Sequence, residues 1–203
     1  MSMIIAIVLS AGESRRMGSP KALLPIGGET FIERIVSALE KSNVGRIIVV
    51  LGHNAEEIKQ KISHLPVTVV VNEDYAKGQL SSLIAALRSL ETEEVAPEVD
   101  GLLVHLVDLP FLNPSLVNAM IDRFYASNKL IVVPSHKGRR GHPVIFSRKL
   151  FPELLRAPLD QGAKAVTRAH RDETLEIETE DGNVLVDIDT PEDYVEHIGR
   201  KIG

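Results

Sequence analysis

Short apolar runs alternate with amphipathic segments along most of the chain. The runs have the length of buried β-strands and predict strands at 4–9, 47–51, 67–71, 102–107, 130–133, 144–146 and 184–188. Apolar residues at helical spacing predict helices at 55–62, 81–90, 114–125, 148–155, 162–170 and 191–198. A further helix begins after Thr30, because Thr30 and Glu33 match a capping box and an apolar face follows, formed by Ile32, Ile35, Val36 and Leu39.

The order of these elements predicts the fold. Strands that alternate with helices pair in parallel through right-handed crossovers, and the helices cover both faces of the sheet. The alternation breaks after residue 144, which predicts one antiparallel strand. The acidic segment 91–100 predicts a solvated linker. We therefore expect one domain over residues 1–203, with a three-layer α/β/α fold and a Rossmann-like, mostly parallel mixed sheet of about seven strands.

Composition narrows the classes of function. The 203 residues carry a formal net charge of -5, which argues against broad attraction to nucleic acid or to an anionic membrane. The chain has no cysteine, which excludes disulfides and thiolate metal sites and fits a reducing cytosol. The apolar run near the N-terminus is shorter than a membrane span, and arginines follow it rather than precede it as in a signal peptide. We expect a cytoplasmic protein with no nucleic-acid or membrane partner.

A cationic loop follows the first predicted strand. The stretch LSAGESRRMGSPKALLP, residues 9–25, gathers Arg15, Arg16 and Lys21 beside glycines. Ligands bind beyond the carboxyl ends of strands in open α/β sheets, and cations placed there favour phosphate. The spacing matches neither the Walker A loop nor the GxGxxG dinucleotide motif. The loop is long enough to wrap around a triphosphate; a solvated charged loop is the alternative.

Carboxylates follow two of the predicted strands. Asp108 ends the apolar run LLVHLV, where it serves either as a cap or as a ligand. Asp187 and Asp189 lie two residues apart, so a strand would aim both side chains to one side. Next to a triphosphate these oxygens predict Mg²⁺, held by Asp108 and Asp189 with Asp187 as a third candidate. The segment after Asp189 matches a helix start with Thr190 as N-cap.

A second cationic segment, HKGRRGHPVIFSRK, occupies residues 136–149 and carries five formal positive charges without an acid. In an acidic chain this segment is either a solvated hairpin or a second anion site, with Arg140 and His142 as candidate ligands. His105 lies inside a predicted strand and is interpreted as a core residue.

The loop motif has a known counterpart. LSAGESRRMGSPKALLPIGG resembles the LxAGxSxRMGxxKxLLPxxG signature of the MobA-like NTP transferases, with the closest likeness to the molybdenum cofactor cytidylyltransferases. Further motifs occur in the family's order and extend the resemblance over nearly the whole chain: GQLSSL at 78–83, VDLPFL at 107–112, GHPVIF at 141–146 and DIDTPEDY at 187–194.

The resemblance implies a role for several residues. Nucleotide contacts are implied for Leu9, Ser10, Ala11, Gly12, Gly78 and Ser82, and phosphate contacts for Arg16 and Lys21, which with Asp108 form the catalytic set. Acceptor contacts are implied for Arg140, His142 and Pro143. Relatives that select guanine tend to carry a glycine where this chain has Ala11, so the resemblance favours CTP.

The expected reaction is transfer of CMP from CTP to the phosphate of molybdopterin or molybdenum cofactor, with release of pyrophosphate and with Mg²⁺ as cofactor. Alternatives within the enzyme class are GTP as donor, or a sugar-phosphate or isoprenoid-precursor acceptor. The Asp187-Ile188-Asp189 triplet also matches the DxD motif of glycosyltransferases. An alternative from another class is a non-catalytic accessory protein that delivers cofactor to a molybdoenzyme or chaperone partner.

Overall fold

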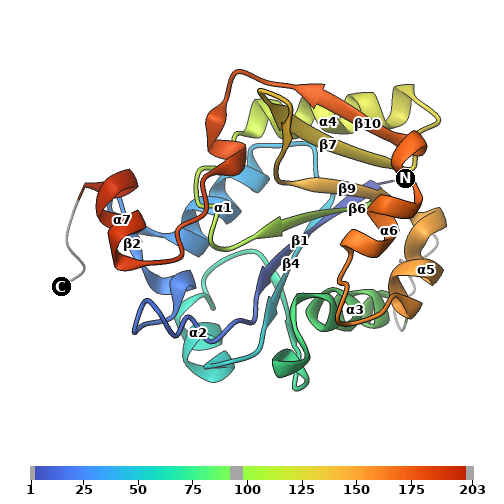
Figure 1. The fold of residues 1–203 in the computed structure, drawn as a ribbon. Helices are drawn as coiled ribbons and strands as arrows, with labels where there is room; N and C mark the ends of the chain where they lie inside the picture. Colours follow the sequence, from blue (N-terminus) through green and yellow to red (C-terminus); the bar gives the residue numbers. More distant parts are fainter. Residues whose placement is uncertain (1–2, 92–97, 200–203) are drawn as a thin grey trace.

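The computed structural model describes residues 3–91 and 98–199 and is built around one mixed sheet (Figure 1). The strands lie in the order β10-β7-β9-β6-β1-β4-β5, and β8 pairs with β7. Their bounds are β1 Met3–Ser10, β4 Arg46–Leu51, β5 Thr68–Val71, β6 Val99–Leu106, β7 Ile131–His136, β8 Arg139–Arg140, β9 Val144–Ser147 and β10 Thr174–Glu178. A separate two-stranded sheet joins β2, Pro25–Ile26, to β3, Glu29–Thr30.

The sheet is mostly parallel, as expected. β1 pairs in parallel with both β4 and β6, and β10 pairs in parallel with β7. β9 is inserted between β6 and β7 and runs antiparallel to both. The predicted antiparallel strand after residue 144 is therefore confirmed, and it lies inside the sheet.

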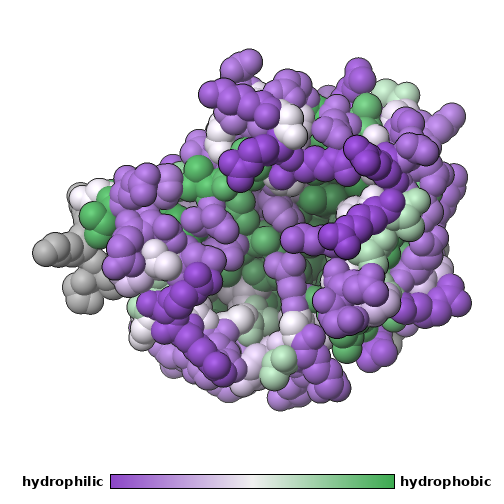
Figure 2. Space-filling view, in the orientation of Figure 1, coloured by the Kyte–Doolittle hydropathy of each residue, from purple (hydrophilic) through white to green (hydrophobic). Residues whose placement is uncertain are grey.

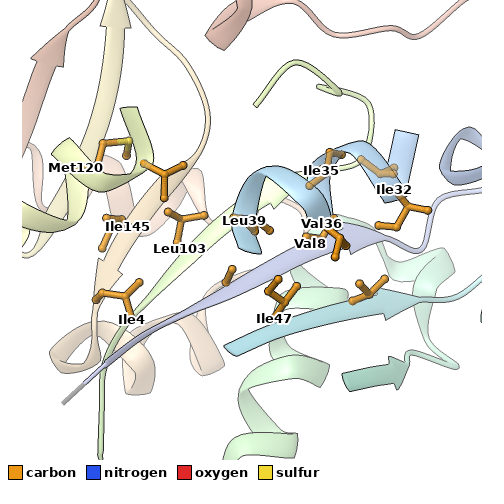
Figure 3. Packing of buried hydrophobic residues seen from close by; sticks show 14 of the residues in the cluster. Ile4, Val8, Ile32, Ile35, Val36, Leu39, Ile47, Leu103, Met120 and Ile145 are labelled. Atoms are coloured by element: carbon orange, nitrogen blue, oxygen red, sulfur yellow. The ribbon is translucent and has the colours of Figure 1, made fainter. Parts of the chain in front are cut away.

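Helices cover both faces of the sheet and make it the middle of three layers. They are α1 Phe31–Glu40, α2 Ala55–Lys61, α3 Gln79–Glu91, α4 Pro114–Ala126, α5 Phe151–Arg156, α6 Lys164–Ala169 and α7 Pro191–Ile198. Apolar side chains of α1, α2 and α4 pack on one face, and those of α3, α5 and α6 pack on the other. Figure 3 shows the first contact, in which Ile32, Ile35 and Val36 of α1 lie over Val8 of β1.

The capping box predicted at Thr30 is present at the start of α1. The Glu33 backbone N–H donates to the Thr30 hydroxyl, and the Glu33 carboxylate accepts from the Thr30 backbone N–H at 2.7 Å. Six of the seven predicted strands are also found, each within a few residues of its expected bounds. The sequence pattern therefore placed most of the sheet.

The predicted strand at 184–188 is wrong. Gly182–Leu185 forms a 3-10 helix, and the edge strand that pairs with β7 is β10, which the pattern did not predict. Val184 is buried in the core, and its carbonyl accepts a hydrogen bond from the His142 backbone N–H at 3.0 Å. The 3-10 helix thus satisfies the His142 backbone N–H, as a neighbouring strand would otherwise do.

The expectation of a solvated linker at 91–100 falls mostly on residues 92–97, which lie outside the described residues. On either side, Glu91 ends α3 and Val99 begins β6. Every helix within the described ranges is too short or too polar to cross a membrane.

Candidate active site

A cleft of about 300 Å³ opens where β1 and β6 end, at the carboxyl edge of the sheet. Figure 2 shows a hollow with a partly hydrophobic floor on this face, bordered by strongly hydrophilic side chains. Five separate parts of the chain line the cleft: Ser10 at the end of β1 with Ala11, Gly12, Arg16 and Lys21 after it; Ile58 of α2; Tyr75, Gly78, Gln79 and Ser82 around the start of α3; Leu106 at the end of β6 with Val107 and Asp108 after it; and Asp189 before α7. The sequence segments that we assigned to the nucleotide thus meet in one place.

Local contacts fix the loop after β1. The Ser14 hydroxyl accepts a hydrogen bond from the Lys21 backbone N–H at 3.1 Å, which closes the loop upon itself. The Ala11 carbonyl accepts from the His53 backbone N–H at 3.1 Å. Gly52 allows that approach, because a Cβ at this position would lie 2.8 Å from the Ala11 carbonyl oxygen. The loop is therefore held from both ends.

Lys21 lies between two carboxylates. Its ammonium donates a hydrogen bond to Asp189 Oδ1 and lies 3.5 Å from Asp108 Oδ2. Its side chain is only 11% exposed. Arg16 Nη2 donates to the other oxygen of Asp189 at 2.7 Å, although the Arg16 side chain remains 65% exposed. The two cations assigned to phosphate thus neutralise the aspartates assigned to the metal.

Asp108 has one oxygen without a hydrogen-bond partner among the described residues. Oδ1 is buried and accepts no hydrogen bond from any described residue. Burial raises the pKa of Asp108, and the neighbouring Lys21 ammonium opposes this shift. Hydrogen bonding by Lys21 has the opposite effect on Asp189 and lowers its pKa. The negative charge is therefore less favourable on Asp108 than on Asp189, and a further cation would stabilise Asp108 more.

Asp189 is positioned by its neighbours. The Ile188 backbone N–H donates to the Asp108 carbonyl at 2.8 Å, and the Ile188 side chain is fully buried. The Asp189 backbone N–H donates to the Asp193 carboxylate at 3.0 Å, next to the predicted cap of α7 by Thr190. Asp187 is exposed and does not line the cleft. Within the described part of the chain, no three carboxylate or histidine side chains are placed to hold a metal together.

A larger pocket of about 470 Å³ adjoins the cleft and shares Leu9, Gln79 and Leu106 with it. Its walls are largely apolar, with polar side chains among them: Gln79, Arg140, His142, Asp160, Gln161, Lys164, Thr167 and Thr174. Pro143 is buried and does not line this pocket.

His142 contributes a neutral ring to the pocket. Burial lowers its pKa, and its Nδ1 has no partner among the described residues.

The remaining histidine of interest, His105, is buried as expected. Its Nε2 lies 2.8 Å from the carbonyl oxygen of Leu109, and burial lowers its pKa to about 3. Because a carbonyl can only accept, His105 donates from Nε2 and braces the turn that carries Asp108.

The comparisons with known proteins agree with this geometry. Residues 6–174 match the family model described as the MobA-like NTP transferase domain. The chain belongs to the MobA-like NTP transferase family. It is a nucleotidyltransferase.

Two curated relatives of this MobA-like chain show how wide the family is. The molybdenum cofactor cytidylyltransferase of Escherichia coli (strain K12) is 29% identical over 96% of this chain and 95% of its own. The nicotine blue oxidoreductase of Paenarthrobacter nicotinovorans is 28% identical over 93% of each chain. These two names belong to different reaction classes at nearly equal identity, so we argue the donor and the acceptor from the site itself.

Solved structures that are similar to this chain share the architecture. Rv0371c of Mycobacterium tuberculosis H37Rv is 29% identical and superposes with a TM-score of 0.83, covering 98% of this chain and 99% of that one. A second structure of Rv0371c is a complex with manganese and superposes with a TM-score of 0.80. The three-layer α/β/α fold is thereby confirmed.

Several residues of this MobA-like site were not predicted from the sequence. Ser14 fixes the backbone of Lys21, Tyr75 and Gln79 line the cleft, and Lys164 lines the adjoining pocket. Ser14 and Gln79 lie within the quoted motifs, at positions to which the sequence assigned no role, whereas Tyr75 and Lys164 lie outside those motifs. Only the arrangement of the loops in space brings them to the site.

Proposed function

We propose that residues 1–203 act as a single nucleotidyltransferase domain, which transfers CMP from CTP to the phosphate of a molybdopterin-type acceptor. The observation that carries this proposal is the convergence of Arg16, Lys21, Asp108 and Asp189 in one cleft that opens into a largely apolar pocket. The cleft has the charges that a triphosphate and its cation require. The pocket offers the apolar walls that a ring system requires.

In the proposed reaction, an oxygen of the acceptor phosphate attacks the α-phosphorus of CTP. A new bond forms between that oxygen and the α-phosphorus, the bond to the α,β-bridging oxygen breaks, and pyrophosphate leaves. A phosphate monoester has a second pKa of about 6, so the attacking oxygen is already ionised near neutral pH. No protein base is required. The residues of the cleft therefore act by positioning and by neutralising charge.

Asp108 and Asp189 fit a divalent cation, which we propose to be Mg²⁺. The buried, unpartnered Oδ1 of Asp108 is an oxygen of the kind that Mg²⁺ prefers, and one or two carboxylates together with substrate phosphates are a usual ligand set for this ion. When bound, the ion would neutralise negative charge on the triphosphate. The manganese complex of Rv0371c supports a divalent metal in this family.

The cations of the cleft then change partners. Lys21 and Arg16 form ion pairs with Asp189, which places them at the carboxyl ends of β1 and β6. We infer that they turn to the phosphates of CTP once the carboxylates are neutralised by the metal. Lys21 is the more buried of the two and supplies a fixed charge, whereas the exposed Arg16 can fork onto two phosphate oxygens.

Ala11 and the E. coli relative, named as a cytidylyltransferase, support CTP as the donor. The backbone from Leu9 to Gly12, with Gly78 and Ser82 across the cleft, lines the space for the nucleoside. Asn72 donates to the Ser82 hydroxyl at 3.0 Å, which orients that side chain. On the acceptor side, Arg140 and the neutral His142 supply the polar contacts.

The deciding experiment measures pyrophosphate release by the purified protein with Mg²⁺, molybdopterin and each of the four NTPs in turn. We expect release that requires both the acceptor and CTP, and a product that contains CMP. If pyrophosphate is released with GTP and with no other nucleotide, the donor is GTP rather than CTP. Tight binding of CTP and acceptor without release would favour the accessory protein, which delivers cofactor to a molybdoenzyme or chaperone, and would overturn the proposed activity.

A further inference from the structure

A buried amide side chain adjoins the wall of the nucleotide cleft. Asn72 directly follows β5, is only 5% exposed and does not itself line the cleft. Its backbone N–H donates to the Leu51 carbonyl at 2.8 Å, which fixes its main chain to β4. Its side-chain Nδ2 lies 2.9 Å from the Ser81 hydroxyl and 3.0 Å from the Ser82 hydroxyl. Its Oδ1 accepts from the Asp74 backbone N–H at 3.0 Å, so both ends of the amide are bonded.

The chemistry of these partners fixes the direction of each hydrogen bond. A backbone N–H can only donate, so the Asn72 atom that faces the Asp74 backbone N–H is the amide oxygen. The reversed amide would place two donors against each other. The amide nitrogen therefore faces the two serines and donates one proton to each hydroxyl oxygen.

The two serines differ in what accepts their own hydroxyl proton. Ser81 Oγ lies 2.7 Å from the Gly78 carbonyl oxygen and 3.0 Å from that of Asp74, so its proton is donated within the protein. The Ser82 hydroxyl makes no hydrogen bond except the one from Asn72 within residues 3–91 and 98–199. Ser82 is 3% exposed and lines the cleft, whereas Ser81 does not. A buried hydroxyl proton is thus left without an acceptor at the wall of the cleft.

We propose that Asn72 is a positioning residue, which makes Ser82 a hydrogen-bond donor to an acceptor atom of the bound nucleoside. This inference rests on the proposed function and specifies how that site holds its nucleotide. Asn72 occupies a lone pair of Ser82 Oγ, so the Ser82 proton points away from Asn72. The group that Ser82 contacts must therefore accept, as a base carbonyl oxygen or a ribose oxygen does and an amino group does not.

The first test compares the two serines by isothermal titration calorimetry with CTP and Mg²⁺. In Ser82→Ala the dissociation constant for CTP should rise about 3- to 10-fold, because one net hydrogen bond is lost. Ser81→Ala is the matched control, since Ser81 also accepts from Asn72 but lies outside the cleft. This control should lower the melting temperature and leave the dissociation constant within about twofold. Tripolyphosphate with Mg²⁺ has no nucleoside and should bind to both variants as to the wild type.

The second test reverses the polarity of the amide. Asn72→Asp keeps the shape of the side chain but replaces the donor by an acceptor, which takes up the Ser82 proton. The dissociation constant for CTP should rise at least as much as in Ser82→Ala. In the double variant Asn72→Asp/Ser82→Ala it should rise by no more than about twofold beyond Ser82→Ala, because Asn72 acts on the nucleoside through Ser82. A merely structural role of Asn72 would instead give losses that multiply.

Circular dichroism establishes that each variant is folded. If Asn72→Asp does not fold, the comparison of Ser82→Ala with Ser81→Ala decides the question. Equal CTP affinities in these two variants, or an equal loss of tripolyphosphate binding in Ser82→Ala, would overturn the positioning role. Losses that multiply in a folded double variant would overturn it too.

The same titrations separate this inference from the proposed transfer reaction. Weaker CTP binding in Ser82→Ala without pyrophosphate release by the wild type supports the role of Asn72 and counts against transfer. Pyrophosphate release by the wild type together with unchanged CTP affinity in Ser82→Ala overturns the role of Asn72 and leaves the transfer reaction standing. If another NTP binds in place of CTP, the same pattern is expected with that nucleotide.

Discussion

Asp108 places an unpaired carboxylate oxygen at the end of an apolar strand. Its Oδ1 is buried without a described partner, although Lys21 lies near the other oxygen. A buried polar group left unsatisfied costs about 1–3 kcal/mol. Asp108 thus makes the fold less stable than an apolar residue at this position would. Function explains the retention of such a group, because stability is often lost where a ligand must be bound.

Replacement of either charged partner should separate activity from stability. In Asp108→Asn and in Lys21→Ala, the rate of pyrophosphate release should fall about 10²- to 10³-fold, as when one preorganised electrostatic contact is lost. Asp108→Asn should not lower the melting temperature. Burial raises the pKa of Asp108, so its charged form is disfavoured in the fold and the neutral amide avoids this cost. Kinetics and thermal unfolding measure the two quantities.

Exposed residues of the same types provide the controls. Asp122→Asn on α4 and Lys59→Ala on α2 should keep full activity, because both lie outside the cleft. Unchanged turnover in both cleft variants would contradict the assignment of the site. A loss of turnover that accompanies a loss of folding would also contradict the assignment of the site.

The sequence could predict Asp108 but not the choice between the two later aspartates. An acid directly after a continuous apolar run must lie at a strand end, where ligands bind. Asp187 and Asp189 would point to one side only in a strand, where side chains alternate at period two. That segment is irregular, and Ile188 is anchored by the Asp108 carbonyl, so only Asp189 lines the cleft.

At the scale of elements, His170 joins α5 to the turn between α6 and β10. Its Nδ1 lies 2.6 Å from a carboxylate oxygen of Glu173, and its Nε2 lies 2.8 Å from one of Glu153. Both ring nitrogens can donate only when the ring is protonated. The hydrogen bonds with Glu173 and Glu153 raise the pKa of His170. This part of the wall beside the acceptor pocket is therefore sensitive to pH.

The sign of this effect follows from linkage. A histidine pKa raised on folding stabilises the folded state below the unfolded value of about 6.5, and that contribution is lost as pH rises through the raised folded pKa. The wild type should exceed His170→Gln by up to about 1 kcal/mol in unfolding free energy at pH 5.5, and by much less at pH 9. Urea denaturation across this range gives the difference. Glu153→Gln should lose part of the same pH dependence, whereas a difference independent of pH would contradict the role of His170.

Elements of the sheet interior were predictable and the edge was not. Strands β1, β4 and β6 are covered on both faces, so they have continuous apolar runs that signal a buried strand. β10 reads TLEIE, with two exposed glutamates, because an edge strand is only partly covered. Conversely, the run VLVDI at 184–188 is apolar because Val184 and Ile188 are buried, although neither lies in a strand. Hydrophobicity reports burial, and only in the interior of the sheet does burial imply a strand.

At the scale of the whole molecule, the candidate site depends on long-range closure. The Asp189 side chain lies 173 residues beyond Arg16 in the sequence, yet the two are joined by a 2.7 Å hydrogen bond. Ile188 is in turn bonded to the Asp108 carbonyl. The cleft therefore brings together the first strand, the middle of the sheet and the segment before α7. A ligand in the cleft contacts all three and should stabilise the entire fold.

Thermal unfolding with CTP should reveal both the binding and its dependence on a cation. At a CTP concentration 100 times its dissociation constant, with Mg²⁺ present, binding adds about 2.7 kcal/mol, which corresponds to a rise of roughly 5–10 °C in melting temperature for a chain of this size. With EDTA in place of Mg²⁺ the rise should largely disappear, because the triphosphate then faces Asp108 and Asp189 without a metal ion to neutralise them.

Asp108→Asn is the informative comparison, since it removes one of the two repelling charges. CTP in the presence of EDTA should raise the melting temperature of this variant more than that of the wild type, while added Mg²⁺ should raise it less. Equal shifts in both proteins under both conditions would mean that Asp108 neither faces the triphosphate nor contributes to holding a cation. The melting temperature thus tests the geometry of the cleft even for variants whose turnover is too slow to measure.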